Sequence, residues 1–322
     1  MEYTPCEEDA FAANWVELLY FELLASICSF VLAGVSGTLI YLVVIKNPHK
    51  KLRTSLSAVV ITMATGSLLM GLIAEPLFMY FTIATLNDVI INPQAPFLLF
   101  AILLSFTSSM ATLFSVVGIT VNRYLFVTVP GWFKLNVSFN RTLIATSMGW
   151  IIAISYPFLY FNTGLRRYCI LHSTAGVLFT TFPLIFTFAW IFNKLEALKN
   201  RGQVQLIVQE ACVSYKHSWL LVASLGCYVP ALVMTIIAEL CSDCSCMSKA
   251  WLTRTSFLIT RLHCAICPVA YAIYLNQYRS AMRNMVFKKM VHESVMSSIR
   301  RTEREINCFE MSKTSGIRTA KL

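Results

Sequence analysis

LLASICSFVLAGVSGTLIYLVVI, residues 23–45, contains no charged side chain over its whole length. At a rise of about 1.5 Å per residue, a helix of this length crosses the ~30 Å hydrocarbon core of a bilayer. Further stretches of this kind follow: 54–81 (with Glu75), 95–122, 142–165, 173–193, 218–238 and 255–275 (with Arg261). We therefore predict an all-α membrane protein built as a seven-transmembrane helix bundle.

The composition of the whole chain agrees with a membrane protein. Hydrophobic residues make up 57% of the 322 residues, and charged residues make up only 13%. A soluble bundle with an apolar core is the alternative, but helices that are apolar on every side are typical of a membrane. Residues 1–22 are acidic and contain no Lys or Arg, so they do not resemble a secretory signal.

The chain is expected to form one membrane domain between two tails. We predict an extracellular N-terminal tail at 1–22 and the seven-helix domain at 23–275. At 276–291, apolar residues recur at helical spacing among Arg and Lys, which predicts a short amphipathic helix on the cytoplasmic membrane surface. The mixture of Ser, Thr and alternating charges at 292–322 predicts a disordered cytoplasmic tail.

Basic residues gather on one side of the predicted spans. That side carries Lys46, Lys50, Lys51, Arg53, Arg123, Lys134, Arg141, Lys194, Lys199, Arg201, Lys216, Arg279, Arg283, Lys288 and Lys289. The opposite loops hold only Arg166, Arg167, Lys249 and Arg254. The positive-inside rule then predicts a multi-pass membrane protein with its N-terminus outside and its C-terminus in the cytoplasm. The net charge of +10 is explained by this topology and by contact with lipid, and not by binding of nucleic acid.

Candidate catalytic groups are scarce within the spans. The aspartates, Asp9, Asp88 and Asp243, all lie outside them, which excludes a protease with paired intramembrane aspartates. Of the five histidines only His263 lies in a predicted span, too few for a His-rich zinc hydrolase. No Ser/His/acid set and no phosphate-binding glycine loop is present. We therefore expect no catalytic residue, no metal site and no cofactor.

Short motifs inside the spans indicate which class of seven-helix membrane protein this is. In chain order they are Asn122-Arg123-Tyr124, Trp150, Phe182-Pro183-Leu184, Cys227-Tyr228-Val229-Pro230 and Cys267-Pro268-Val269-Ala270-Tyr271. Their order and depth resemble those of the rhodopsin-like (class A) G-protein-coupled receptors, whose corresponding motifs include D-R-Y, C-W-x-P and N-P-x-x-Y. The resemblance covers about residues 34–287. A transporter or channel is the alternative, although such proteins usually show several intramembrane acids or broken helices in matched halves.

The resemblance implies a receptor of the plasma membrane that couples an extracellular ligand to a heterotrimeric G protein, with arrestin and receptor kinases as further partners. It also implies an Arg123–Glu210 ion pair that holds the third and sixth spans together until activation breaks it. The alternative is that Arg123 is a static arginine that reaches the membrane surface, and the surrounding motifs favour the switch. The predicted switch residues are Asn122, Arg123, Tyr124, Glu210, Tyr228, Pro230, Pro268 and Tyr271.

Several positions depart from the family pattern. Ser67 stands where the family has an aspartate, and His263, Cys264 and Cys267 stand where Asn, Ser and Asn are usual. A buried sodium ion needs hard oxygen ligands and normally a carboxylate, so we expect no sodium inhibition. Asn122 in place of an aspartate also leaves Arg123 without a local counter-charge. These changes motivate the hypothesis of raised basal activity.

Two positions restrict the ligand. Ser105 stands where amine receptors carry an aspartate, and Arg261 stands where opsins carry the lysine that binds retinal. A guanidinium stays protonated and forms no Schiff base, so neither an amine nor retinal is expected. Arg261 either pairs with Glu75 or, with help from Arg254, Arg166 and Arg167, recognises an acidic ligand. The predicted ligand-binding residues are Glu75, Ser105, Tyr228, Arg254 and Arg261.

The cysteines predict an unusual set of disulfides. Those expected outside the membrane are Cys6, Cys169, Cys241, Cys244 and Cys246. No cysteine lies between Cys28 and Cys169, so the family's usual bridge to the third span is impossible. Extracellular thiols usually oxidise, so we expect Cys169 to pair with Cys6 or with the 241–246 cluster. Zinc binding by Cys241-x-x-Cys244 is an alternative to a disulfide, and we favour the disulfide. A cysteine-rich third outer loop is similar to melanocortin-type receptors and suggests a peptide ligand, although Pro183 departs from that group.

Overall fold

The computed structural model contains a bundle of long helices. It describes residues 13–46, 54–87, 96–187, 189, 193, 204–241, 244–274 and 278–279. Among these residues seven spans are long and apolar enough to cross a membrane: Val16–Ile45, Ser55–Leu86, Pro96–Phe126, Phe139–Thr163, Arg167–Phe186, His217–Leu240 and Met247–Ile273. The predicted all-α, seven-helix membrane fold is confirmed.

Several of the spans are divided into more than one helical element. The first comprises α1 (Ala13–Tyr41) and the π-helical turn η1 (Leu42–Lys46), and the second comprises α2 (Ser55–Leu69), the π-helical turn η3 (Met70–Ala74) and α3 (Glu75–Leu86). The third is α4 (Pro96–Thr128), which the short α5 (Pro130–Asn136) follows. The fourth comprises α6 (Phe139–Ser155), the 3-10 turn η4 (Tyr156–Leu159) and α7 (Tyr160–Thr163). The last three are α8 (Leu165–Phe186), α10 (Val204–Leu240) and α11 (Cys246–Tyr274).

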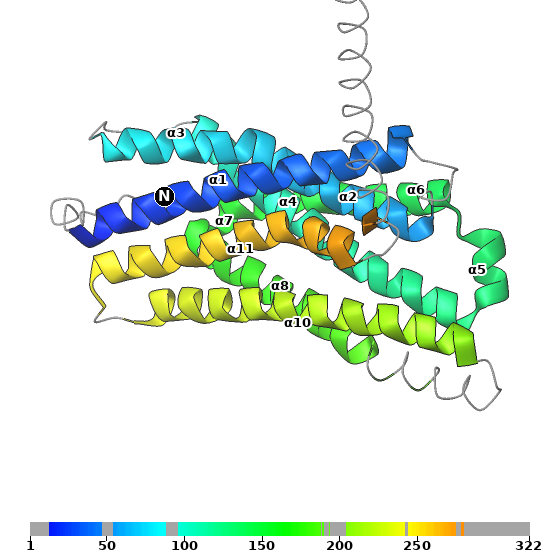
Figure 1. Ribbon diagram of the computed structural model, residues 1–322. Coiled ribbons are helices and arrows are strands. Elements are labelled where there is room, and N and C mark those ends of the chain that lie inside the picture. The colour runs from blue at the N-terminus through cyan, green and yellow to red at the C-terminus, as the bar shows by residue number, and fades with distance from the viewer. Residues whose placement is uncertain are drawn as a thin grey trace, which may run out of the picture. The chain divides into compact units, whose positions relative to one another are not determined.

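The spans close into a ring with α4 at its centre. Each span packs against the next one along the chain, and α11 returns to pack against α1 (Figure 1). In addition, α4 contacts α2, α3, α6, α8, α10 and α11. In the most apolar part of the third span 61% of the residues are buried, against 11% in the fourth span. The third span is therefore the central helix, and the fourth lies at the periphery.

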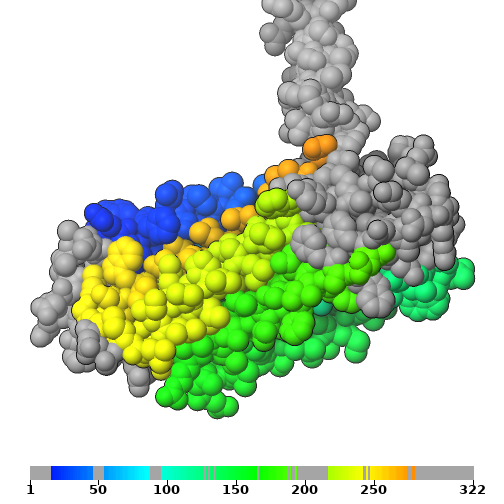
Figure 2. Space-filling model, turned by 90° about the horizontal axis from the view of Figure 1, so that it is seen from below, coloured from blue at the N-terminus to red at the C-terminus, as the bar shows by residue number. Residues whose placement is uncertain are grey.

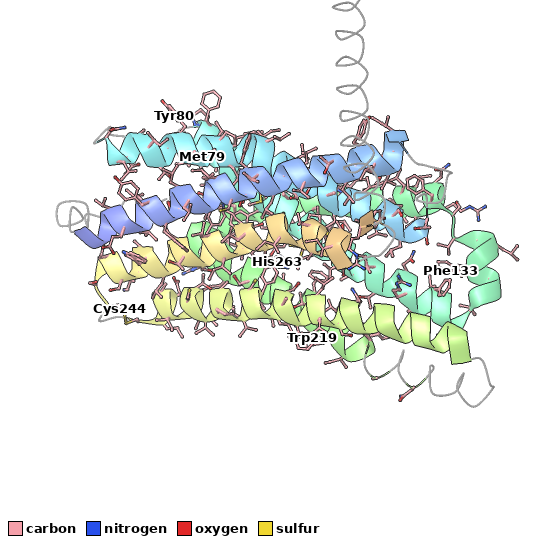
Figure 3. The ribbon with its side chains drawn as sticks, viewed as in Figure 1. Met79, Tyr80, Phe133, Trp219, Cys244 and His263 are labelled. Atoms are coloured by element: carbon pink, nitrogen blue, oxygen red, sulfur yellow. A yellow bond between two sulfur atoms is a disulfide. The ribbon has the colours of Figure 1, made fainter. Side chains whose placement is uncertain are left out.

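One face of the bundle displays the sixth span between its neighbours. The surfaces of α11, α10 and α8 lie side by side there (Figure 2). Large apolar side chains are exposed on these helices, among them Phe182 of α8 and Trp219 of α10, and Trp219 points away from the bundle (Figure 3). An apolar outer surface is what a membrane-spanning bundle offers to lipid. Cys244 lies at one end of the bundle and Phe133 of α5 at the other (Figure 3), and we call these the Cys244 end and the α5 end.

The first two spans approach each other closely at Gly71. A Cβ atom built on Gly71 would lie 2.2 Å from the Cβ of Ala33 and 3.1 Å from the carbonyl oxygen of Ser29. Any larger residue at this position would push α1 away from η3. Small residues at such crossings allow transmembrane helices to pack closely.

The π-helical turn η3 decides where Glu75 points. Pro76, which follows directly, has no N–H to donate, and this favours a local change in helix geometry. One additional residue in a turn rotates the residues after it by about 100° around the helix axis. Glu75 is fully buried in the interior of the bundle. The irregular turn therefore orients the acidic side chain of Glu75 toward the interior of the bundle.

Several spans begin earlier than predicted, the first and the seventh among them. α1 begins at Ala13 and not at residue 23, and α11 begins at Cys246 and not at residue 255. Glu22 and Arg254, whose charges limited the predicted spans, form an ion pair of 3.6 Å between these two helices. Residues 13–22, which were predicted as part of an extracellular tail, are therefore helical and belong to α1.

The chain divides into two units, Met1–Leu275 and Asn276–Leu322, and the bundle belongs to the first. In the second unit only residues 278–279 are described, and they are helical. The rest of the predicted surface helix at 276–291 and the predicted tail at 292–322 lie outside the described residues.

Candidate functional site

The first polar cluster in the bundle is a buried ion pair, with Arg261 of α11 at its centre. Its Nε donates to Oε1 of Glu75 at 3.2 Å, and its Nη2 donates to Oε2 of the same carboxylate. Nη2 also donates to the hydroxyl of Ser26 on α1 at 2.9 Å. The side chains of Arg261 and Glu75 are 5% and 0% exposed. The ion pair that was one of the two interpretations of Arg261 is confirmed.

Aromatic rings surround the Arg261 guanidinium as well. Its Cζ lies 3.9 Å from the ring centroid of Phe78 and 5.6 Å from that of Phe257. Cation–π contacts of this kind stabilise a desolvated guanidinium. Arg254, which pairs with Glu22, was expected to assist Arg261 in recognising an acidic ligand. Such recognition would require both ion pairs to open.

A second cluster, which we call the aromatic cluster, consists of Phe106, Tyr156, Tyr168 and His172. The ring centroids of Tyr156 and Tyr168 are 5.4 Å apart, and those of Tyr168 and His172 are 6.3 Å apart. Phe106 lies 4.5 Å from Tyr168 and 5.0 Å from His172. Three polar atoms of the cluster, Oη of Tyr156, Oη of Tyr168 and Nδ1 of His172, are buried without a hydrogen-bond partner among the described residues.

The aromatic cluster is hydrogen-bonded to α10 through one serine of α4. The hydroxyl of Ser109 lies 3.0 Å from Nε2 of His172 and 3.1 Å from Oη of Tyr228. The Tyr228 ring fits against α8 because residue 176 is glycine, since a Cβ there would lie 2.2 Å from the ring. These contacts link α8, α4 and α10 in the middle of the bundle.

His263 of α11 extends the network from Tyr228 to α11. Its ring centroid lies 4.8 Å from that of Tyr228, and its Nε2 lies 2.9 Å from the hydroxyl of Ser224 and 3.1 Å from Sγ of Cys267 (Figure 3). The nearby Cys264 lies 3.2 Å from the hydroxyl of Thr112. Hydroxyl, thiol and imidazole groups therefore fill the positions for which the family resemblance implies a sodium site. The absence of sodium inhibition stays a prediction.

A third polar contact joins three helices toward the α5 end. Nε2 of His217 on α10 lies 2.8 Å from the hydroxyl of Thr120 on α4. Nδ1 of the same imidazole is hydrogen-bonded to the hydroxyl of Tyr271 on α11. A neutral imidazole has one donor and one acceptor nitrogen, and two hydroxyl groups can satisfy both. We call these three residues the His217 link.

The expectation that His263 is the only histidine within a span is wrong. His172 and His217 lie in the spans Arg167–Phe186 and His217–Leu240, and both are buried. The predicted spans began at residues 173 and 218, one position after each histidine, whereas the observed spans begin at Arg167 and His217. Helical spacing could have found His217, because it lies on the same face of α10 as Ser224 and Tyr228.

Three of the predicted switch residues, Asn122, Arg123 and Tyr124, lie in α4 near the α5 end. Oδ1 of Asn122 accepts a hydrogen bond of 3.4 Å from Ser55, which links α4 to α2. Arg123 is half-buried at this end of α4, and the Tyr124 ring lies 4.9 Å from Phe186 on α8. Glu210 lies on α10, but its side chain is outside the described part of the chain. The Arg123–Glu210 pair stays a prediction.

Three more predicted site residues lie within the long helices. Pro230 and Pro268 lie inside α10 and α11, which continue through them. Ser105 is buried on α4, close to the aromatic cluster in sequence. Its role in ligand binding stays a prediction.

The cysteines confirm one prediction and contradict another. Cys241 and Cys244 form a disulfide, as favoured over zinc binding. The prediction that Cys169 takes part in a disulfide is wrong, since its thiol is free and buried. The reason is that α8 begins at Leu165, so Cys169 belongs to a helix that packs in the core. Cys6 and the side chain of Cys246 lie outside the described residues.

No protein-family model matches this chain, and no curated protein matches it either. The family resemblance therefore rests on the motifs themselves. Within the residues that the structure describes, no three His, Cys, Asp or Glu side chains gather so that they could hold a metal ion. The polar clusters consist of hydrogen bonds and an ion pair between helices. Such contacts can form and break when the helices move.

Proposed function

We propose that this membrane protein is a rhodopsin-like receptor of the plasma membrane that transmits the binding of an extracellular ligand to heterotrimeric G proteins. The Cys244 end then faces the outside and the α5 end faces the cytoplasm. Arrestin and receptor kinases are its further partners. The function is an equilibrium between two helix arrangements, which a ligand shifts by binding one of them more tightly.

The observation that carries this proposal is the way in which α10 is attached to the rest of the bundle. Its inner face is hydrogen-bonded at four levels, through His217, Ser224, Tyr228 and the carbonyl oxygen of Ala231, which accepts from Ser256. Their partners lie on α4 and α11 and are neutral hydroxyl and imidazole groups. A solvent-exposed ion pair of 3.8 Å also joins Glu239 of α10 to Arg167 of α8. By contrast, α1, α3 and α11 are connected by the buried Arg261–Glu75 ion pair and its bond to Ser26.

The free energies of these contacts favour α10 as the helix that moves. A neutral hydrogen bond contributes about 0.5–1.5 kcal/mol net, so the attachments of α10 are together worth a few kcal/mol. A gap of a few kcal/mol between two states is what a ligand can overcome through its differential affinity. Breaking a buried ion pair costs ~3–5 kcal/mol for a single contact. Pro230 adds a point within α10 where the backbone lacks one hydrogen bond and can bend.

Nucleotide exchange on a purified G protein tests the proposal. The protein in lipid vesicles should accelerate exchange above vesicles without it, and a ligand library screened against each G-protein class should increase the rate further. Arg123→Ala is the matched variant that should abolish coupling while the protein still folds. Ligand-free exchange no faster than in empty vesicles would contradict raised basal activity.

A transporter or channel is the second candidate, because ionisable residues buried in a membrane often mark a substrate pathway. Glu75 and Arg261 are such residues. Flux of a solute into liposomes that contain the protein, without accelerated nucleotide exchange in any G-protein class, would overturn the receptor proposal.

A further inference from the structure

The polar atoms of the aromatic cluster are buried but not satisfied by the protein. Oη of Tyr156, Oη of Tyr168 and Nδ1 of His172 are enclosed by protein atoms and have no hydrogen-bond partner among the described residues. An unpaired polar group in a protein interior is destabilising. Three such atoms in one cluster therefore indicate a place where a hydrogen-bonding molecule is stabilised.

The three atoms belong to rings that surround one point of the bundle. Tyr168 and His172 are one turn apart on the same face of α8, and their rings are 6.3 Å apart at an interplanar angle of 20°. The ring of Tyr156, which η4 supplies, lies 5.4 Å from Tyr168 and 6.1 Å from His172. The phenol groups of Tyr156 and Tyr168 also lie close enough to act electrostatically on each other. One small molecule among these rings can therefore reach all three polar atoms.

The surroundings restrict this molecule to a small and uncharged one. The ring of Phe106 closes the cluster on the side of α4, at 4.5 Å from Tyr168 and 5.0 Å from His172. Tyr168 packs in the same apolar core as Ala101 and Ile102. The aromatic cluster contains no acidic or basic side chain besides the imidazole, so a bound ion would lose its hydration without gaining a counter-charge there.

The hydrogen bonds of His172 require a molecule that can both donate and accept. The single hydroxyl proton of Ser109 is directed either to Oη of Tyr228 or to Nε2 of His172, which lie 3.1 Å and 3.0 Å away. In the first case Nε2 carries the imidazole proton and Nδ1 is an acceptor, and in the second case Nδ1 carries the proton and is a donor. Water satisfies Nδ1 in both cases, whereas an ammonium ion only donates and an anion only accepts.

We propose that the aromatic cluster binds an internal water molecule, which Tyr156, Tyr168 and His172 hold in place. Buried water molecules in proteins typically make about three hydrogen bonds, and the cluster offers three partners. The water joins η4 of the fourth span to α8 of the fifth. Through His172 and Ser109 it is also connected to Tyr228 on α10. Water binding is independent of the receptor proposal.

The direction of a stability change tests the site. Tyr168→Phe removes one hydroxyl group and leaves the ring. A hydroxyl that is bonded to water stabilises the fold, so its loss should lower the thermal unfolding midpoint by ~1–4 °C. A hydroxyl that is buried without any partner is unfavourable, so its loss would raise the midpoint. Tyr156→Phe should act in the same direction, and the exposed Tyr80→Phe is the control that should leave the midpoint unchanged.

A double variant tests whether the two hydroxyl groups share one molecule. Once Tyr168→Phe has removed one partner of the water, Tyr156→Phe should lower the midpoint by less than it does in the wild-type background. Equal shifts in both backgrounds would mean that the two hydroxyl groups do not hold a common water, and would contradict the shared site.

Hydroxyl-radical footprinting of the wild-type chain in lipid nanodiscs detects the water directly. A short X-ray pulse converts a bound water into a radical that oxidises the side chains in contact with it. We expect oxidation of Tyr156 and Tyr168 despite their enclosed hydroxyl groups. Tyr228 is the internal control, because it is fully buried and hydrogen-bonded to Ser109, and it should be oxidised several-fold less.

A midpoint that stays the same or rises in both single variants, or oxidation of Tyr156 and Tyr168 no faster than that of Tyr228, would overturn the proposal. The second result comes from the wild-type chain, so it decides the question even when a variant fails to fold.

Discussion

Replacing Glu75 by Met should destabilise the protein by ~3–5 kcal/mol, because it leaves a charged guanidinium buried without its counter-charge. Arg261 is 5% exposed, and its carboxylate partner is 0% exposed, so water cannot replace the lost contact. The hydrogen bond to Ser26 and the ring of Phe78 at 3.9 Å remain in the variant. These remaining contacts place the expected loss toward the lower end of the range.

The double variant Glu75→Met/Arg261→Met distinguishes a lost ion pair from a packing defect. Apolar residues of similar size often replace a buried ion pair without loss, so we expect the double variant to be more stable than either single variant. The assay is unfolding of the purified protein in lipid nanodiscs, followed by tryptophan fluorescence. Ser26→Ala is the control, since it removes one hydrogen bond to the guanidinium and should cost about 1.5–3 kcal/mol. Additive losses, with a coupling free energy below ~0.5 kcal/mol, would refute the reasoning.

Three further changes test other contacts. His217→Phe removes the two neutral hydrogen bonds of the His217 link, worth ~1 kcal/mol each, so ligand-free nucleotide exchange should rise by up to ~30-fold; an unchanged rate would show that the link does not restrain α10. Gly176→Ala places a methyl group 2.2 Å from the Tyr228 ring and should cost about 1–3 kcal/mol in unfolding free energy, whereas in a Tyr228→Leu background the loss should be much smaller. Cys244→Ser opens a disulfide between residues only three positions apart, so thermal unfolding should show a loss of at most ~2 kcal/mol; a larger loss would mean that the bridge holds more than its own short loop.

The seven spans could be predicted because hydropathy is a local property of the chain. Each stretch without charge is long enough to cross a membrane, whatever its neighbours are. The ends of the spans could not be predicted with the same rule. Glu22 and Arg254 lie inside helices because each offsets the charge of the other across α1 and α11, and this pairing is visible only once the helices are placed side by side.

The same distinction, between local properties of the chain and contacts between helices, explains which contacts of the candidate site could be predicted. The Arg261–Glu75 pair was among the expected alternatives, because opposite charges in an apolar bundle are stabilised by pairing. The contacts of Ser109 with His172 and Tyr228 could not be derived, since they depend on how three helices are rotated about their axes. A serine on an apolar helix has no sequence signature that tells which neighbour it faces.

The distribution of strong and weak contacts gives the bundle two parts with different freedom to move. Around Arg261, an ion pair joins α3 to α11, a hydrogen bond to Ser26 adds α1, and the close packing at Gly71 keeps the first two spans together. Around Tyr228, neutral hydrogen bonds are the polar contacts described between α10 and its neighbours on the inner side. A change in the aromatic cluster is therefore expected to displace α10 more readily than the helices around Arg261. Because α10 is one continuous helix from Val204 to Leu240, a displacement at Tyr228 also strains the His217 link, and we expect the two contacts to open together.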